Sequence, residues 1–464
     1  MRPDYNQALE WLESHVNLEK LVSTEYRVPT LDRITQLCRY LADPHLDYPV
    51  IHVTGTNGKG SVVNMISAVL IAHGLRVGTY TSPDLTSVTE RIASNLTPIS
   101  TQEFAENLDI LRNLEPLLNN IPSRFELLTA LAFKWFSDIA VDVAVVEVGL
   151  GGTWDATNVV SSAVSVITNI DLDHTELLGE TKPEIAQEKA GIIKQASTCV
   201  TGETDPEIVA VFEKVAKTKN AVLARIGRDF DYFQDRLAVG GHLFSASIFG
   251  RQYSDLYIPL RGSHQVRNAV LALAGCDSFF MSPSEIGEGG AVGREEVAPE
   301  RLDLVRGALE EVTIPGRLEV LGTRPLVIVD GAHNPAGIRV AMDALDEEFD
   351  RHLDRIVVMG LLKGRSIEDM VRPVVRDGLE LLVACRAPSP RTVDPKEIEQ
   401  IAGKLGAQCI CVPSLEESIQ LALGKAGEDH LVFITGSMYV VGLARSLLRQ
   451  ENPATLTAKR EKSL

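Results

Sequence analysis

Residues 49–61 read PVIHVTGTNGKGS, an apolar run that breaks into a glycine-rich turn. Pro49–Thr54 is typical of a buried strand, and apolar residues at helical spacing over Ser61–His73 predict a helix that ends at Gly74. The glycines allow a sharp bend that aims backbone N–H donors inward, while the helix N-terminus and Lys59 add positive charge. A strand, a turn and a helix of this kind predict a phosphate-binding site.

The turn does not follow the strict P-loop pattern. Val53 stands where that pattern has its first glycine, and Gly60 separates Lys59 from Ser61. The alternative is therefore a purely structural turn between strand and helix. We favour phosphate binding because the context matches the mechanism, and we expect the Ser61 hydroxyl to be available to a magnesium ion.

The composition is that of an ordinary globular protein. The chain has 464 residues, of which 45% are apolar and 23% charged, which excludes a collagen, a coiled coil and a mainly disordered chain. Its formal net charge of -18 argues against a uniformly basic surface but leaves room for a local basic pocket. We therefore expect neither a nucleic acid nor a membrane as a partner.

The cysteines and the N-terminus indicate the compartment. The six cysteines are scattered without zinc-ligand spacing, and a large secreted chain would need a denser disulfide framework. The N-terminus lacks the apolar core of a signal peptide, and the most apolar long stretch, Ile139–Leu150, is too short and too charged to span a bilayer. We expect a cytoplasmic protein with reduced thiols.

Alternating strand and helix patterns predict an α/β protein with a mostly parallel sheet. Arg236–Ile248 is typical of a hairpin, and Gly287–Pro299 is predicted to be an exposed loop. After a hinge at Ile314–Arg317, we predict a second alternating series, which divides the chain into a larger domain over 1–312, a smaller doubly wound domain over 313–451 and a mobile tail over 452–464. The strands predicted for the second domain are Leu326–Val329, Arg355–Met359, Leu379–Ala384, Gln408–Val412 and Leu431–Thr435.

Polar residues follow two further predicted strands at their carboxyl ends, the sheet edge where open α/β proteins bind ligands. Glu147 ends the strand Val141–Val148, where its carboxylate would suit magnesium; capping of a helix N-terminus is the alternative. Asp171, Asp173 and His174 follow the next strand. For His174 the alternatives are a metal ligand and a satisfied polar residue.

Lys189 lies in a predicted helix beside Glu188. An ammonium group has no lone pair for a metal, so Lys189 could support a metal site only when neutral and modified, for example as a carbamate. The ordinary alternative is an ion pair on the helix surface.

Two turns of the second domain, Asp330–Pro335 and Gly436–Tyr439, follow predicted strands and should face one sheet edge. They form either a second ligand-binding surface or ordinary turns, in which Pro335 suits the first turn of a helix.

Taken together, these segments resemble the folylpolyglutamate synthase/dihydrofolate synthase family of the Mur ligase superfamily. The resemblance spans about residues 30–445, in the family's order. It implies an N-terminal P-loop, Mur-ligase-type ATPase domain and a Rossmann-like C-terminal glutamate-ligase domain. The motifs are Gly55–Ser61, Thr81–Pro83 with Glu90–Ile92, Glu147–Gly152 with Asp155–Asn158, Asp173-His174 with Leu178-Gly179, Glu188–Ile193, Pro315–Arg317, Asp330–Pro335 and Thr435–Ser437.

The resemblance also implies roles for individual residues. The catalytic residues would be Lys59, a carbamylated Lys189, Asp155 and, for placing the incoming amine, His333. The ATP-binding residues would be Asn57, Gly58, Lys59, Gly60, Ser61, Asn268, Arg317 and Asp330. The metal ligands would be Ser82, Glu147 and His174. The pteroyl substrate would be bordered by Leu31, Asp32, Arg33, Arg124, Phe125, Glu126 and Thr153.

The implied activity is ATP-dependent addition of L-glutamate to dihydropteroate, to reduced folates, or to both, through an acyl phosphate. The implied cofactors are ATP, one or two Mg²⁺ ions and K⁺, and we expect a monomer. A peptidoglycan-precursor ligase of the Mur group is one alternative, which we disfavour because the phosphate turn lies close to the start of the sequence. A nucleotide-binding regulatory relative without ligase activity is another.

Two positions depart from the family pattern. Asp84 stands where family members commonly carry histidine, and we expect it to add negative charge beside the metal or the substrate. Leu362–Ser366 replaces the usual Asp-Lys-Asp after a strand of the second domain. These departures motivate the regulatory alternative.

Overall fold

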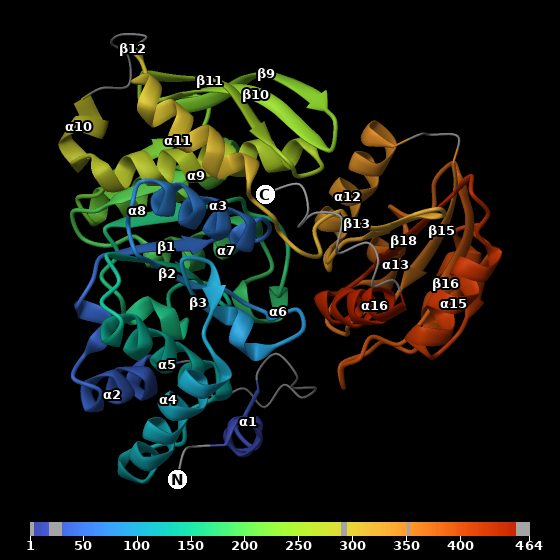
Figure 1. Cartoon of the computed structure of the whole chain (residues 1–464), viewed down its shortest axis with the longest axis horizontal. Coiled ribbons are helices and arrows are strands. Elements are labelled where there is room, and N and C mark those ends of the chain that lie inside the picture. Colours follow the sequence, from blue (N-terminus) through green and yellow to red (C-terminus); the bar gives the residue numbers. More distant parts are fainter. Residues whose placement is uncertain (1–3, 18–29, 289–294, 350–352, 452–464) are drawn as a thin grey trace, which may run out of the picture. The chain divides into compact units, whose positions relative to one another are not determined.

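The computed structural model describes residues 4–17, 30–288, 295–349 and 353–451, so the predicted tail lies outside the described residues. The chain forms two compact units, Met1–Thr313 and Ile314–Leu464, each with its own sheet and hydrophobic core (Figure 1). Within the described ranges, no helix combines the length and the apolar character needed to cross a membrane.

The main sheet of the first unit has eight strands. Their order is β4 (Thr97–Pro98), β3 (Ile92–Ser94), β2 (Val77–Tyr80), β5 (Val143–Glu147), β1 (Val50–Thr54), β6 (Val164–Ile167), β7 (Thr198–Thr201) and β8 (Val222–Arg225). Neighbours from β2 to β8 are parallel, and β3 and β4 add antiparallel pairs at one edge. The mostly parallel sheet is thus confirmed, with β1 between β5 and β6.

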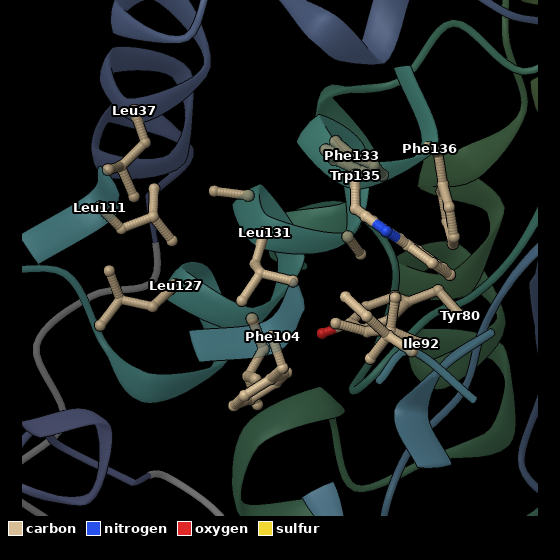
Figure 2. Packing of buried hydrophobic residues seen from close by; sticks show 14 of the residues in the cluster. Leu37, Tyr80, Ile92, Phe104, Leu111, Leu127, Leu131, Phe133, Trp135 and Phe136 are labelled. Carbon is tan, nitrogen blue, oxygen red and sulfur yellow. The ribbon is translucent and has the colours of Figure 1, made fainter. Parts of the chain in front are cut away.

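Helices cover both faces of this sheet (Figure 1). On one face, α3 (Lys59–Ala72) packs against α9 (Ser263–Phe280), and α11 (Pro299–Glu310) packs against α3. The other face carries α5 (Arg124–Asp138), with α1 (Tyr5–Glu13), α2 (Asp32–Tyr40) and α4 (Thr101–Leu114) around it. Figure 2 shows Trp135 and Phe136 of α5 in this core with Tyr80 and Ile92 of the sheet. A separate apolar cluster joins β6 and β7 to α7 (Lys182–Lys189) and α8 (Pro206–Thr218).

A second, four-stranded sheet belongs to the same unit. Its order is β12 (Glu295–Glu296), β11 (Arg251–Ile258), β10 (Gly241–Ile248) and β9 (Phe230–Ala238). The predicted hairpin is confirmed as β9 and β10, and the sequence did not reveal β11. The predicted loop Gly287–Pro299 is partly wrong, because β12 pairs with β11 and Val297 is buried; residues 289–294 lie outside the described residues.

The second unit holds a six-stranded sheet. Its order is β13 (Glu319–Thr323), β14 (Leu326–Val329), β18 (His430–Thr435), β15 (Asp354–Met359), β16 (Leu379–Ala384) and β17 (Cys409–Cys411). The helices are α12 (Pro335–Glu348), α13 (Ile367–Val371), α14 (Pro395–Lys404), α15 (Leu415–Lys425) and α16 (Met438–Glu451). The five predicted strands are confirmed with small shifts at their ends. Only β13, which pairs antiparallel with β14, was not predicted.

Candidate active site

The glycine-rich turn joins β1 directly to α3. The helix begins at Lys59, earlier than the predicted Ser61, and its N-cap residue Gly58 has a φ of +84°. A larger residue would be strained by this φ, and its Cβ, 2.7 Å from Oδ1 of Asn268, would require the Asn268 side chain to move. The structure thereby brings the predicted ATP-binding residue Asn268 of α9 to the turn.

A segment after β6 holds the turn in shape. The Asn57 N–H donates to Oδ1 of Asn169 at 2.9 Å, and the Thr56 N–H donates to the carbonyl of Asn169 at 2.8 Å. The hydroxyl of Thr168 donates to the carbonyl of Asn57 at 2.6 Å. Our sequence reasoning assigned no role to Thr168 or Asn169, although their place directly after a buried strand was a usable signal.

Two lysines converge on one backbone carbonyl of the turn. Nζ of Lys59 lies 3.2 Å from the Gly55 oxygen, and Nζ of Lys189 donates to the same oxygen at 2.9 Å. Lys189 is only 4% exposed, so the surface ion pair considered for it is wrong. Burial lowers the pKa of Lys189 to about 7, and the positive charge of Lys59 acts in the same direction; nearby carboxylates oppose this shift without cancelling it.

Glu147 lies beside the turn at the end of β5. Its side chain is buried, and its Oε2 accepts the Ser82 N–H at 3.1 Å. A Cβ built on Gly60 would be 3.4 Å from the same oxygen, which places the carboxylate next to the first turn of α3. The following helical turn, Ala156–Val159, is capped by the carboxylate of Asp155 and not by Glu147.

The side chains around Glu147 suit a hard cation. Ser82 donates its backbone N–H to the Glu147 carboxylate, and Ser61 follows Gly60 in the first turn of α3. A carboxylate and two serine hydroxyls offer oxygen donors only, the type that Mg²⁺ prefers. The structure brings Ser82 to Glu147 and places His174 beside Asp173, with 3.9 Å between Nε2 and Oδ1. The role of His174 as a metal ligand stays a prediction.

Asp155 organises the loop formed by residues 149–158, which we call the glycine loop. Its Oδ2 accepts the Leu150 N–H at 2.9 Å, and its Oδ1 accepts both the N–H and the hydroxyl of Thr157 at 3.0 and 2.5 Å. Burial raises the pKa of the Asp155 carboxyl, and these hydrogen bonds limit the rise. Thr153, on the same loop, donates its N–H to Oε1 of Glu188 at 2.9 Å.

The residues predicted to border the substrate gather near the N-termini of α2 and α5. A capping box between Ser123 and Glu126 starts α5, and Nε of Arg33 lies 3.0 Å from both Glu126 oxygens. The ring of Phe125 packs so closely on Gly149 that a Cβ there would lie 2.5 Å from Cζ. Leu31 is half-buried and Asp32 exposed at the start of α2, whereas Arg124 is buried and pairs with Glu13 at 2.7 Å.

Asp84 does not add a free negative charge, contrary to our expectation. Its Oδ1 lies 2.5 Å from Nε of Arg91, whose side chain is 2% exposed. Burial alone would raise the pKa of Asp84, but the charge and hydrogen bond of Arg91, with the charge of Arg124, outweigh it and lower the pKa. The carboxylate is thus neutralised within the chain.

In the second unit, the two predicted turns lie at one sheet edge, as expected, because β14 and β18 are parallel neighbours. Oδ2 of Asp330 accepts the Leu318 N–H at 2.9 Å, and Oδ1 accepts the Ala332 N–H at 2.8 Å. Burial raises the pKa of Asp330, while the charge of Arg317 opposes the rise. His333 packs its Nδ1 3.0 Å from the Gly331 carbonyl, and Asn334 caps α12.

Comparisons with known proteins agree with this geometry. The chain matches the Mur ligase middle domain over residues 53–276 and the Mur ligase glutamate ligase domain over residues 316–438. It is 36% identical to the dihydrofolate synthase/folylpolyglutamate synthase of Mycobacterium tuberculosis, over 91% of each chain. It is 32% identical to the folylpolyglutamate synthase of Lacticaseibacillus casei, over 96% of this chain and 99% of that one.

Solved structures give the same picture. The ADP complex of Mycobacterium tuberculosis folylpolyglutamate synthase superposes with a TM-score of 0.85 at 34% identity, covering 96% of this chain and 98% of that chain. An FPGS–AMPPCP–folate complex superposes with a TM-score of 0.76 at 30% identity, covering 96% of this chain and 99% of that one. The chain therefore belongs to the folylpolyglutamate synthase/dihydrofolate synthase family of the Mur ligase superfamily.

Proposed function

We propose that this protein is an ATP-dependent ligase that joins L-glutamate to dihydropteroate, to a reduced folate, or to both. The observation that carries the proposal is the meeting of Lys59, Lys189 and Glu147 around one glycine-rich turn at the carboxyl edge of the sheet. Relatives described as folylpolyglutamate and dihydrofolate synthases, and solved complexes with nucleotide and with folate, support it.

The reaction needs activation because a carboxylate does not condense with an amine in water. Transfer of the γ-phosphoryl group of ATP to the acceptor carboxylate gives an acyl phosphate and ADP. The glutamate amine then attacks the acyl carbon, and phosphate leaves as the amide bond forms. Lys59 and the N–H groups at the start of α3 would stabilise the charge that spreads over the transferring phosphoryl group.

Glu147, Ser82 and Ser61 are the residues that would hold Mg²⁺, with His174 as a further ligand. A bound Mg²⁺ would supply Lewis-acid stabilisation of the phosphoryl oxygens. The chain itself holds the Glu147 carboxylate beside the turn, because the Ser82 N–H donates a hydrogen bond to this carboxylate.

Lys189 has the chemistry required for carbamylation. A pKa of about 7 leaves a large share of the amine neutral at neutral pH, so that it can attack CO₂ and release one proton as the N–C bond forms. The product would replace a buried cation next to Lys59 with an anion, which removes the repulsion between the two lysines.

In the second unit, Arg317 and Asp330 are proposed to contact ATP and His333 to place the incoming amine. Their support is the turn geometry after β14 and their match to the family motif. Asp330 is itself fixed by two backbone N–H donors, so its position does not depend on a ligand.

Phosphate release in the presence of ATP, L-glutamate and either dihydropteroate or tetrahydrofolate tests the proposal. We expect release that requires all three substrates and a product heavier by one glutamyl residue. Lys59→Ala should reduce turnover by about 100-fold or more, because it removes the positive charge that would stabilise the transferring phosphoryl group. Lys182→Ala removes a nearby exposed lysine that pairs with Asp171 and should leave turnover unchanged.

The outcomes separate the alternatives. Nucleotide binding without acceptor-dependent phosphate release would support the regulatory relative and contradict the ligase. Phosphate release that does not require either dihydropteroate or tetrahydrofolate would contradict the proposed substrate class.

A further inference from the structure

Two side chains of β1 form hydrogen bonds to the glycine loop. Alternate residues of a strand point to one face, and on this face the Thr54 hydroxyl donates to the Gly151 carbonyl at 2.8 Å. Nε2 of His52 lies 2.8 Å from Oγ1 of Thr157. The strand that leads into the phosphate-binding turn therefore also holds the loop that carries Asp155 and Thr153.

For the ionised form of Asp155, the direction of the hydrogen bond from His52 follows from the donors and acceptors present. An ionised Asp155 can only accept, so the single hydroxyl proton of Thr157 is donated to Asp155. The Thr157 oxygen must then accept from His52, which makes His52 the tautomer protonated at Nε2. Burial, helped by the charge of Lys194, lowers the pKa of His52 well below its usual range, so the ring is neutral and this tautomer is available.

A histidine at this position carries a cost that an apolar residue would avoid. Its Nδ1 is buried and has no hydrogen-bond partner among the described residues. An unpaired buried polar atom destabilises a fold, because it has lost its hydrogen bonds to water without gaining others. What the histidine contributes in return is therefore the hydrogen bond from its Nε2 to Thr157.

The far side of the glycine loop rests on the segment that carries Lys189. The N–H groups of Gly152 and Thr153 donate to Oε1 of Glu188 at 3.3 and 2.9 Å. A Cβ at Gly152 would lie 2.8 Å from the Glu188 carbonyl oxygen and 2.9 Å from that of Lys189. The loop thus packs between the side chains of β1 on one side and the backbone of Glu188 and Lys189 on the other.

We propose that His52 is a positioning residue, which acts through Thr157 on Asp155 and so holds the glycine loop against the Glu188–Lys189 backbone. The inference rests on the proposed function and deepens it: His52 serves the pteroyl-acceptor side of the reaction. The phosphate-binding turn is held by Thr168 and Asn169, which are separate from this chain of hydrogen bonds. Loss of His52 should therefore spare ATP binding.

Paired substitutions test the donor itself. His52→Leu removes the N–H, whereas His52→Gln offers an amide N–H at a similar distance. Thr157→Val removes the hydroxyl at constant shape, whereas Thr157→Ser keeps it. We expect kcat/KM for the pteroyl acceptor to fall about ten-fold in the Leu and Val variants, because each leaves a buried polar group without its hydrogen-bond partner. The KM for ATP should stay unchanged. The Gln and Ser variants should recover most of the loss.

A double variant and a control separate positioning from general destabilisation. If His52 acts through Thr157, His52→Leu/Thr157→Val should be no worse than Thr157→Val alone. Thr79→Val removes another buried hydroxyl bond of the same sheet, to Ser67 at 2.9 Å, and should leave the acceptor kcat/KM unchanged. Additive losses, or equal changes in the KM values for ATP and acceptor, would overturn the proposal.

Hydrogen–deuterium exchange gives a readout that does not need turnover. His52→Leu should speed exchange in peptides that cover 149–158 while leaving those that cover 55–61 unchanged. A wild-type protein with no ligase activity but with this exchange pattern would reject the proposed function and keep the positioning role. An active wild type whose loop exchange is insensitive to His52→Leu would reject the positioning role alone.

Discussion

At the scale of single residues, Lys189 combines two features that ordinary lysines lack. Its amine is buried, and it shares the Gly55 carbonyl with Lys59. In the unfolded chain its proton stays bound up to the ordinary pKa of 10.5, whereas in the folded chain it leaves near about 7. Between these values the unfolded state binds more protons, so this group makes stability increase with pH across that window.

Lys189→Met removes this contribution. We expect the free energy of unfolding of the wild type, relative to the variant, to rise between about pH 7 and pH 9 in CO₂-free buffer. Urea unfolding of both proteins at several pH values measures the difference, in which all other titrating groups cancel. A difference that stays flat with pH would show that the Lys189 pKa is not depressed.

Residue roles were predictable where a polar residue ends an apolar run. Glu147 and the turn at Gly58–Ser61 lie next to each other as expected, because the carboxyl ends of parallel strands meet at one sheet edge. The partner of Asp84 was not predictable, because its pairing with Arg91 depends on how a loop folds back. His52 was a missed signal, since a histidine within an apolar strand needs a partner.

At the scale of elements, the glycine loop depends on the absence of side chains where it meets α7. Gly152→Ala would force a Cβ against two backbone carbonyl oxygens, and backbone cannot move aside as a flexible side chain does. We expect kcat/KM for the acceptor to fall by about 100-fold, as for a displacement of around 1 Å near reacting groups. Steady-state kinetics at a temperature well below the unfolding transition measures the effect.

Gly307→Ala is the matched control. Gly307 is exposed in the last turn of α11, with nothing within 4 Å of a new Cβ. This change should stabilise the protein by about 1 kcal/mol through helix propensity and leave the kinetics unchanged. Full activity in Gly152→Ala would contradict the account of the loop.

Element prediction succeeded for strands with continuous apolar runs and failed for those without them. The strands with continuous apolar runs, such as β1, β5 and the parallel strands of the second unit, were predicted, because burial on both faces leaves a strong signal. The buried strand β7 and its neighbour β8 were not predicted, since each is short and carries polar residues. By contrast, β11 and β13 carry mixed polar residues and lie at or near a sheet edge, where their pairing depends on partners distant in sequence.

At the scale of the whole molecule, the two units have separate cores. The main cluster of the second unit draws all its buried residues from 318–433, on β14, β15, β16, β18 and the helices around them. Such a core should support folding without the first unit.

We predict that residues 314–464 expressed alone unfold cooperatively on heating. Circular dichroism at a helix-sensitive wavelength, together with differential scanning calorimetry, measures the transition. A broad, non-cooperative melt would show that the second unit requires the first.

The claim that everything else depends on is that the acceptor carboxylate is phosphorylated by ATP before glutamate attacks. Supplying an acceptor whose carboxylate carries ¹⁸O, and analysing the released phosphate by mass spectrometry, tests it directly. The account predicts one ¹⁸O atom in each phosphate, transferred as the acyl phosphate breaks down. Phosphate without the label, formed at the same rate as the glutamylated product, would contradict it.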